Sequence, residues 1–180
     1  MKPHLWLALR VGLAFPHSSK TLVINSPFSE NLVASCRDTL RAYEPSLTEQ
    51  GVLWTKEKLC ARLRNPRFLY GLHATSRLLL ISSPRIRRGV PYTLLCGFFP
   101  RNGLRPSHRD VREVTRAACQ QWGRPLFVYP GVHNAIPKLP GWKLPHWLRP
   151  STMLVQLRDF QPEKHALKFD RYQPLDFDFA

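Results

Sequence analysis

The sequence is short of acidic residues: 12 Asp and Glu stand against 27 Lys and Arg in 180 residues, a formal net charge of +15. Its 9 glycines are outnumbered by 17 prolines, which predicts many conformationally fixed loops. No apolar run approaches the roughly 18 residues of a membrane-spanning helix, so we expect no membrane partner. A hydrophobic content of 43% argues against wholesale disorder.

Several common chemical signatures are missing as well. The four cysteines lie too far apart for a zinc knuckle or a redox pair, and each lies in an apolar segment that predicts a buried thiol: Cys36, Cys60, Cys96 and Cys119. Phosphate-loop, dinucleotide-fold, serine-hydrolase and zinc-protease motifs are absent. Arg10 interrupts the apolar N-terminus and no clean cleavage site follows, so we expect a cytoplasmic, reduced protein.

The positive charge is concentrated in the middle of the chain. Residues 52–116 contain 14 Lys and Arg against 3 Asp and Glu, whereas residues 159–180 contain three bases and five acids. Because most of the cations are arginines, this surface is suited to phosphate on nucleic acid, on a phosphorylated cofactor or at an anionic membrane face. An ordinary solvated surface is the alternative interpretation.

The first third of the chain predicts one short strand and two helices. We expect the strand at 22–24 and a helix at 27–43, with Ser26 as its N-cap and Pro27 at its first position. A second helix is expected at 55–64.

The sequence of residues 68–99 predicts antiparallel strands. Three short apolar runs, Phe68–Ala74, Arg77–Ser82 and Tyr92–Phe99, are separated by short links, and the second link is the basic turn 84–89. Links this short join hairpins.

The clearest local signal is a helix at 107–122. Ser107 and Asp110 form a capping box at its start, and Gly123 suits its end. Arg109, Arg112 and Arg116 repeat along it, as a phosphate-binding row or as a solvated face opposite the apolar stripe.

A buried strand at 126–129 follows the helix. A helical crossover between this strand and the strand at 92–99 makes the two parallel neighbours. We expect a loop at 130–151, a strand at 153–157 and an edge strand within 169–180. The predicted fold is α+β, with a mixed, mostly antiparallel sheet, flanking helices and three regions: a poorly defined segment 1–25, one domain at 26–160, and a tail at 161–180.

Three groups of residues resemble the GNAT-like acyl-CoA N-acyltransferase superfamily, in particular the C-terminal half of its two-lobed members. They are Leu53-Trp54 followed by Arg64-Asn65-Pro66 and Tyr70, then Gly123-x-Pro125 leading into Leu126–Tyr129, and Arg149-Pro150-Ser151-x-Met153. The resemblance covers residues 50–160. In that family a hairpin leads to a central strand, a helix that supports the cofactor, and a strand that diverges from the central one.

The resemblance implies acetyl-CoA or another acyl-CoA as cofactor, held at the turn before the 107–122 helix. Its expected contacts are Arg101, Asn102, Gly103, Arg105 and Ser107. The family uses a glycine-lined turn of backbone N–H groups here. This turn has one glycine, and Pro106 removes a donor, so its location and charge match the family while its cradle does not.

The resemblance also implies roles beyond the diverging strand. Tyr129 would protonate a leaving thiolate, and His133 would act as base. Asn134, Trp142 and Trp147 are candidates for substrate contact, the two tryptophans by stacking on a base or an adenine ring. For the tryptophans, packing of the proline-rich loop onto the core is the favoured interpretation.

Two functions are therefore expected from the sequence. The first is transfer of an acyl group from acyl-CoA to an amine on a small molecule or peptide, or the role of a truncated or inactive relative of such an enzyme. The alternative is a basic, non-catalytic protein that binds nucleic acid.

Overall fold

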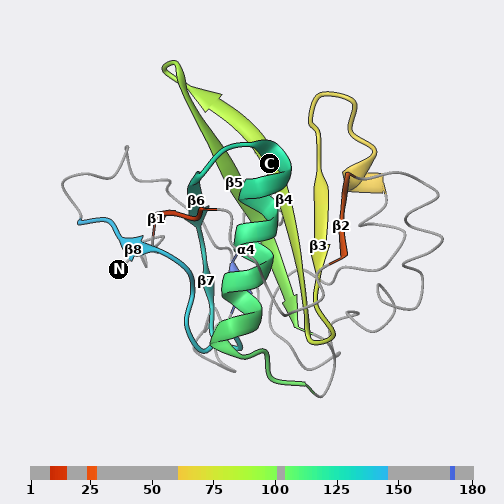
Figure 1. Cartoon of the computed structure of the whole chain (residues 1–180), viewed down its shortest axis with the longest axis vertical. Helices are drawn as coiled ribbons and strands as arrows, with labels where there is room; N and C mark the ends of the chain where they lie inside the picture. Colours follow the sequence, from red (N-terminus) through yellow and green to blue (C-terminus); the bar gives the residue numbers. More distant parts are fainter. Residues whose placement is uncertain (1–8, 16–23, 28–60, 101–103, 146–170, 173–180) are drawn as a thin grey trace, which may run out of the picture.

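A computed structural model describes residues 9–15, 24–27, 61–100, 104–145 and 171–172. Within them the chain forms an α+β fold whose main sheet has seven strands in the order β2-β3-β4-β5-β6-β1-β8 (Figure 1). All neighbouring strands in it are antiparallel except β5 and β6. The predicted class, a mostly antiparallel mixed sheet with a helix packed on it, is confirmed at this level.

The centre of the sheet is a long hairpin of β4 (Leu78–Arg87) and β5 (Val90–Pro100). A shorter strand, β3 (Gly71–Ala74), pairs with β4, and β2 (Ile24–Pro27) pairs with β3. The predicted hairpins are confirmed, but the expected basic turn at 84–89 was wrong in extent. The strands continue to Arg87 and Val90, because backbone pairing across the hairpin outweighs the local turn signals of Pro84 and the arginines.

The hairpin turn itself consists of Arg88 and Gly89. Both have positive φ angles, 50° and 77°, as a two-residue turn that follows the twist of the strands requires. Glycine adopts this backbone without penalty, whereas arginine is uncommon there.

Two expectations near β2 change. Ser26 and Pro27 belong to the strand, opposite Leu72 and Gly71, so they do not form the start of a helix. Strand pairing here outweighs the capping signal, and the remainder of that expected helix, 28–43, lies outside the described residues. Of the expected helix at 55–64, the described residues 61–63 are helical.

Helix α4 (His108–Trp122) lies across one face of the sheet (Figure 1). It begins at the N-cap Ser107 and ends at Gly123, whose φ of 61° is left-handed. Strand β6 (Leu126–Pro130) follows and runs parallel to β5, as predicted. The helix, its caps and the parallel crossover are thus confirmed.

The chain ends of the described region add further strands. Strand β1 (Leu9–Leu13) pairs with β6 on one side and with β8 (Trp142–Lys143) on the other. Strand β7 (Val132–His133) pairs with β9 (Arg171–Tyr172) in a separate two-stranded sheet. The uninterrupted loop expected at 130–151 is therefore wrong, and the expected C-terminal strand joins β7 instead of the main sheet's edge. The expected strand at 153–157 lies outside the described residues.

The sheet has a hydrophobic core on each face. Alternate residues of β4 belong to alternate cores. Leu78 and Leu80 pack with α4 on one face of the sheet, while Leu79 and Ile81 pack in the core on the opposite face. The register of β4 and β5 shifts between Ile81 and Ser82, which places an extra residue in β5. This bulge lets Leu95 and Phe98 face α4 although they are three residues apart.

A buried polar contact fastens the C-terminal end of α4 to the sheet. The indole Nε1 of Trp122 donates to the Ser82 hydroxyl at 2.8 Å, and His73 Nε2 lies 2.6 Å from the same oxygen. Gly71 lies under the indole ring, where a Cβ would come within 2.9 Å of Trp122 Cζ2. Burial lowers the pKa of His73 to about 3, so the imidazole is neutral at physiological pH.

This buried histidine should make stability depend on pH. Between pH 6.5 and 3 the unfolded chain binds a proton at His73 that the folded protein does not, so stability falls as pH decreases. We expect the free energy of unfolding in urea to drop by up to about 1.4 kcal/mol per pH unit from this group between pH 6 and 5. Replacing His73→Gln should remove that contribution, whereas replacement of the exposed His108→Gln should retain it; equal slopes in both variants would contradict the assignment.

Candidate functional site

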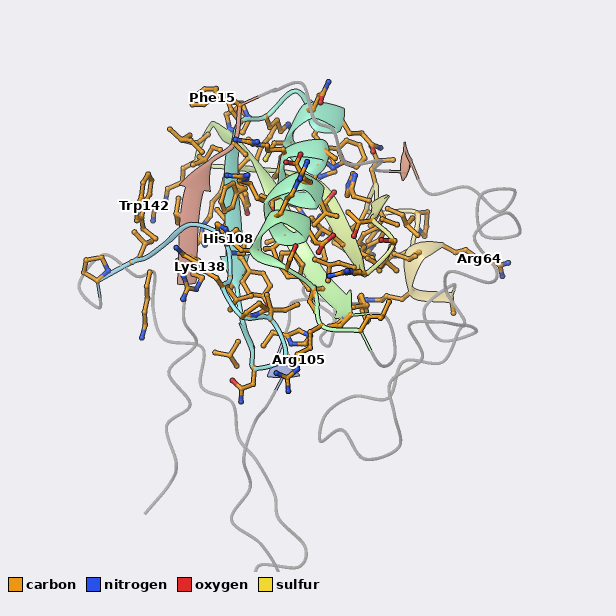
Figure 2. All side chains as sticks on the ribbon, turned by 60° about the horizontal axis from the view of Figure 1, so that its bottom comes forward. Phe15, Arg64, Arg105, His108, Lys138 and Trp142 are labelled. Atoms are coloured by element: carbon orange, nitrogen blue, oxygen red, sulfur yellow. The ribbon has the colours of Figure 1, made fainter. Side chains whose placement is uncertain are left out.

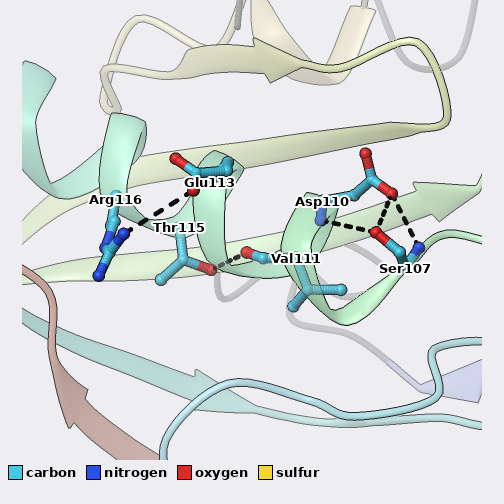
Figure 3. Close-up of polar contacts among 6 residues, drawn as sticks. All are labelled: Ser107, Asp110, Val111, Glu113, Thr115 and Arg116. Carbon is cyan, nitrogen blue, oxygen red and sulfur yellow. Dashed lines mark hydrogen bonds and ion pairs between the residues drawn. The ribbon is translucent and has the colours of Figure 1, made fainter. Parts of the chain in front are cut away.

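The first turn of α4 is closed by its own side chains (Figure 3). The Ser107 backbone N–H and hydroxyl both donate to the Asp110 carboxylate, at 2.8 and 2.6 Å, and the Asp110 N–H donates to Ser107 Oγ at 3.2 Å. This reciprocal pattern is the capping box expected from the sequence. Because the Ser107 donors already bind a carboxylate, they are not directed toward an external anion in this structure.

Asp110 is held in its ionised form by its surroundings. Burial alone would raise the pKa of this carboxyl, but hydrogen bonds from Ser107 and Thr75, together with the charge of Arg77, keep the pKa below its ordinary value. The start of α4 thus has a negative charge of its own, next to the positive end of the helix dipole.

The other residues expected to bind the cofactor surround this turn. Arg101, Asn102 and Gly103 lie outside the described residues. Arg105 is exposed, and Pro106 is buried beside the cap. A glycine-lined cradle is not part of the described portion of this turn, in agreement with the departure seen in the sequence.

A pocket of about 360 Å³ runs along the flank of α4. Its walls come from four places: the end of β1, the exposed flank of α4, β6, and the segment before β8. Phe127 and Val111 give it an apolar floor, and Phe15 stands at its edge. The volume lies within the range typical of small-molecule sites.

Two guanidinium groups, those of Arg112 and Arg116, give the rim of this pocket its positive charge. His108, Arg112 and Arg116 line it at intervals of four residues, which places them on one side of the helix. Arg116 makes an ion pair of 3.8 Å with Glu113 (Figure 3). The row of arginines expected from the sequence is thus divided, because Arg112 and Arg116 line the pocket and Arg109 does not.

The pocket depends on β1, which lies in the segment 1–25 that the sequence pattern leaves poorly defined. Arg10 donates from Nη1 to the carbonyl oxygens of Leu139 and Gly141, at 3.5 and 3.1 Å, and fixes the segment that forms the pocket's outer wall. The signal that would have found this strand is the alternation of Leu9, Val11 and Leu13. Figure 2 shows Phe15 and Trp142 on this side of the molecule and Arg64 on the other.

Strands β5 and β6 are paired over only two positions. Thr93 lies opposite Phe127 and Leu94 opposite Val128, and no further pairing joins these two described strands. Beyond that point the Tyr129 ring packs edge-on against Phe98, with ring centroids 5.2 Å apart. The parallel strands therefore separate toward the N-terminal end of α4, and side chains fill the space between them.

The two expected catalytic residues meet at Phe98. Tyr129 is fully buried against its ring, and His133, which is 5% exposed, donates from Nε2 to its carbonyl oxygen at 3.1 Å. A carbonyl oxygen only accepts, so Nε2 carries the proton, and in the neutral ring Nδ1 carries the lone pair. The fold thus places a phenol and an imidazole in contact with the same residue, Phe98.

The expected acceptor-binding residues are dispersed. Asn134 is exposed directly after β7, and Trp147 lies outside the described residues. Trp142 is 74% exposed on β8, which contradicts the interpretation that it packs the loop onto the core. Pairing of β8 with β1 at the edge of the sheet turns this indole outward.

Metal and thiol chemistry have no visible site in the described part of the chain. No group of three or more His, Cys, Asp or Glu side chains there could hold a metal ion. Cys96 and Cys119 are buried free thiols, as predicted, and burial raises their pKa values to about 12 and 11. Both are therefore protonated and unreactive at neutral pH; Cys36 and Cys60 lie outside the described residues.

Comparison of the chain with models of protein families, with curated proteins and with solved structures finds no match. Among the described helices, none has the length and apolar character needed to cross a bilayer.

The pocket wall gives a test of the structure. Gly141 has a φ of 77°, and a Cβ there would lie 2.6 Å from the Val11 carbonyl oxygen, so Gly141→Ala should destabilise the protein by about 2–4 kcal/mol. Gly89→Ala is the matched control, because it has the same φ of 77° but nothing within 4 Å, and should cost only about 1 kcal/mol. Urea denaturation of both variants measures the difference; equal losses would mean that the Gly141 contact does not form.

Proposed function

We propose that this protein binds an acyl-CoA thioester along the flank of α4 and transfers its acyl group to an amine. The observation that carries the proposal is the end of the β5–β6 pairing at Leu94 and Val128, together with a pocket that has a cationic rim and is lined by Phe127 of β6. An antiparallel hairpin, a central strand, a crossover helix and a diverging parallel strand follow one another here, which is the order that the N-acyltransferase resemblance implies.

The pocket suits the phosphorylated part of such a molecule. Two guanidinium groups, from Arg112 and Arg116, attract phosphate and present forked donors, while Phe127 and Phe15 offer apolar surface to a ring or an alkyl chain. A volume of about 360 Å³ accommodates one portion of a coenzyme A molecule and leaves the remainder to extend along the groove. Because Asp110 occupies the Ser107 donors, phosphate binding falls to side chains in place of a backbone cradle.

The chemistry needs two proton movements. An amine nitrogen attacks the thioester carbonyl carbon, the carbon–sulfur bond breaks, the nitrogen loses a proton and the departing sulfur gains one. The Tyr129 hydroxyl is suited to protonate the sulfur, and Nδ1 of His133 is suited to receive the amine proton. The thioester itself supplies the activated acyl group.

Both groups are buried, which sets a condition on the reaction. The acyl end must enter between β5 and β6 at the position where Tyr129 packs on Phe98, so that ring has to move as the thioester enters. Exclusion of water from this place would protect the thioester from hydrolysis.

The binding half of this proposal is tested with acetyl-CoA and charge-removing variants. R112Q/R116Q should weaken the Kd measured by calorimetry at least tenfold, because each lost guanidinium–phosphate contact is worth about 1.5–3 kcal/mol. R109Q is the matched control, on the same helix but away from the pocket, and should bind like the wild-type protein. No binding by the wild-type protein at millimolar acetyl-CoA, or an equal loss in R109Q, would refute the site.

The catalytic half is tested by Tyr129→Phe. The assay offers acetyl-CoA and a panel of amine acceptors, polyamines and lysine-containing peptides, and detects the released coenzyme A thiol with a thiol reagent. The variant should release this thiol at least about 10²-fold more slowly, with little change in the Kd for acetyl-CoA. Tyr92→Phe is the control, because Tyr92 packs on the far-side core. If the wild-type protein binds acetyl-CoA but transfers the acetyl group to none of these amines, it is a binding protein and the enzymatic role is contradicted.

A further inference from the structure

The described part of the chain has an unusual charge distribution. It contains 16 Lys and Arg but only two acids, so 14 of the 15 net positive charges of the protein lie in it. Both acids, Asp110 and Glu113, are buried and engaged within α4. Among the described residues, therefore, every exposed formal charge is positive.

The sequence around the central hairpin is free of acids over a long distance. Residues 58–109 hold 11 Lys and Arg and no Asp or Glu. A solvated protein face normally mixes both signs, because mixed charge limits self-repulsion. Fifty-two consecutive residues without a carboxylate concentrate positive potential around β3, β4 and β5 and favour a polyanionic partner.

The end of the β4–β5 hairpin projects beyond its neighbours in the sheet (Figure 1). Strand β3 pairs with β4 only as far as Ser82, and β6 reaches β5 only at Thr93 and Leu94. Beyond the pair formed by Pro84 and Thr93, the hairpin continues as a two-stranded ribbon of three more residue pairs and a two-residue turn. No other described strand flanks this ribbon. At about 3.4 Å per residue, this ribbon extends roughly 10 Å.

The base of the ribbon is firmly attached. The Arg85 guanidinium stacks over the Phe68 ring at 3.8 Å, and Arg124 donates from Nη1 to the Arg85 carbonyl oxygen at 2.9 Å. Thr93 in turn donates from its hydroxyl to the Arg124 carbonyl oxygen at 3.0 Å. A ribbon held in this way loses little conformational entropy when it binds a partner.

The tip of the ribbon is basic and exposed. Arg87 and Arg88 lie in solvent together with Ile86 and Val90, which are 67% and 51% exposed. Arg88 has a φ of 50°, where Asn, Asp or Gly suits the backbone better. The turn therefore has a cation at a position that folding alone would give to another residue, and such backbone outliers concentrate at functional sites.

We propose that this ribbon, defined by residues 85–92, binds duplex DNA by entering the major groove. That groove is about 12 Å wide and 8.5 Å deep, so it admits a two-stranded ribbon of this reach. Arg87 and Arg88 contact phosphates or base edges, Ile86 and Val90 provide apolar contacts, and the surrounding cations hold the backbone. This inference does not depend on the acyl-CoA proposal, because the tip lies at the end of β5 remote from the α4 N-terminus (Figure 1).

The experiment uses the full chain and a fluorescein-labelled 20-base-pair duplex of random sequence, with anisotropy measured between 50 and 300 mM NaCl. The test variant is R87Q/R88N, since Asn suits the positive φ of position 88 and should leave the melting temperature unchanged or higher. We expect at least a tenfold loss of affinity and a log–log salt slope that falls by about 2. R88N alone should lose less affinity for the duplex than the double variant does, with no decrease in the melting temperature of the protein.

The matched control is K138Q/K143Q, which removes the same charge from exposed positions near β8. It should retain the salt slope and bind the duplex within about threefold of wild type. The two lysines make no direct contact with the DNA in this proposal, so their removal weakens only the screened, long-range attraction. Equal losses in both double variants would overturn the ribbon as the contact surface, as would the absence of duplex binding at 50 mM NaCl. Tip-dependent binding to phosphatidylserine vesicles, or to single-stranded DNA tenfold more tightly than to the duplex, would also overturn the groove assignment.

Discussion

The antiparallel pairing of β4 with β5 is the interaction on which both hydrophobic cores depend. Alternate residues of the two strands face opposite sides of one sheet, so the same hairpin contributes side chains to each core. Helix α4 packs on one of these faces, and its last residue, Trp122, is tied to Ser82 of β4. The same hairpin positions both features to which function is assigned. At one end β5 separates from β6 beside the Tyr129 and His133 pair, and at the other end the ribbon extends past the sheet.

The scarcity of carboxylates shapes the surface as much as the hairpin shapes the core. Asp110 completes the cap of α4 and Glu113 pairs with Arg116, so the two described acids stabilise the helix and neutralise little of the exterior. The arginines consequently lack exposed acidic neighbours within the described residues. This arrangement raises the cost of self-repulsion, which a bound polyanion would relieve.

At the start of α4 one local interaction, between Ser107 and Asp110, closes the helix N-terminus to an external anion. From the sequence, the positive end of the helix and the nearby arginines marked an anion-binding turn. The Asp110 carboxylate takes the donors of Ser107, and the pocket with phosphate-binding character lies further along the helix at Arg112 and Arg116. Whether a helix N-terminus is open to a ligand depends on the residue at its third position, which here is an acid.

The sequence by itself determined the elements whose stabilising contacts are local. The α4 helix, its capping box and its Gly123 terminus rest on contacts within four residues, and the parallel relation of β5 and β6 follows from the crossover between them. Tyr129 and His133 were expected after the diverging strand, and each contacts Phe98, but their catalytic roles stay predictions. The packing interpretation of Trp142 was wrong, because the exposure of this indole depends on which strand β8 joins.

Only the tertiary structure decided the long-range pairings. Strand β1 lies more than 100 residues from β6 in the chain, and its pairing there creates one wall of the pocket. Ser26 and Pro27 have the local signature of a helix start, yet β3 recruits them into the sheet. The basic segment at 84–89 looks like a loop but continues as a ribbon, because each strand supplies the other's hydrogen-bond partners. In each case backbone pairing between distant segments outweighed a preference that the local residues express alone.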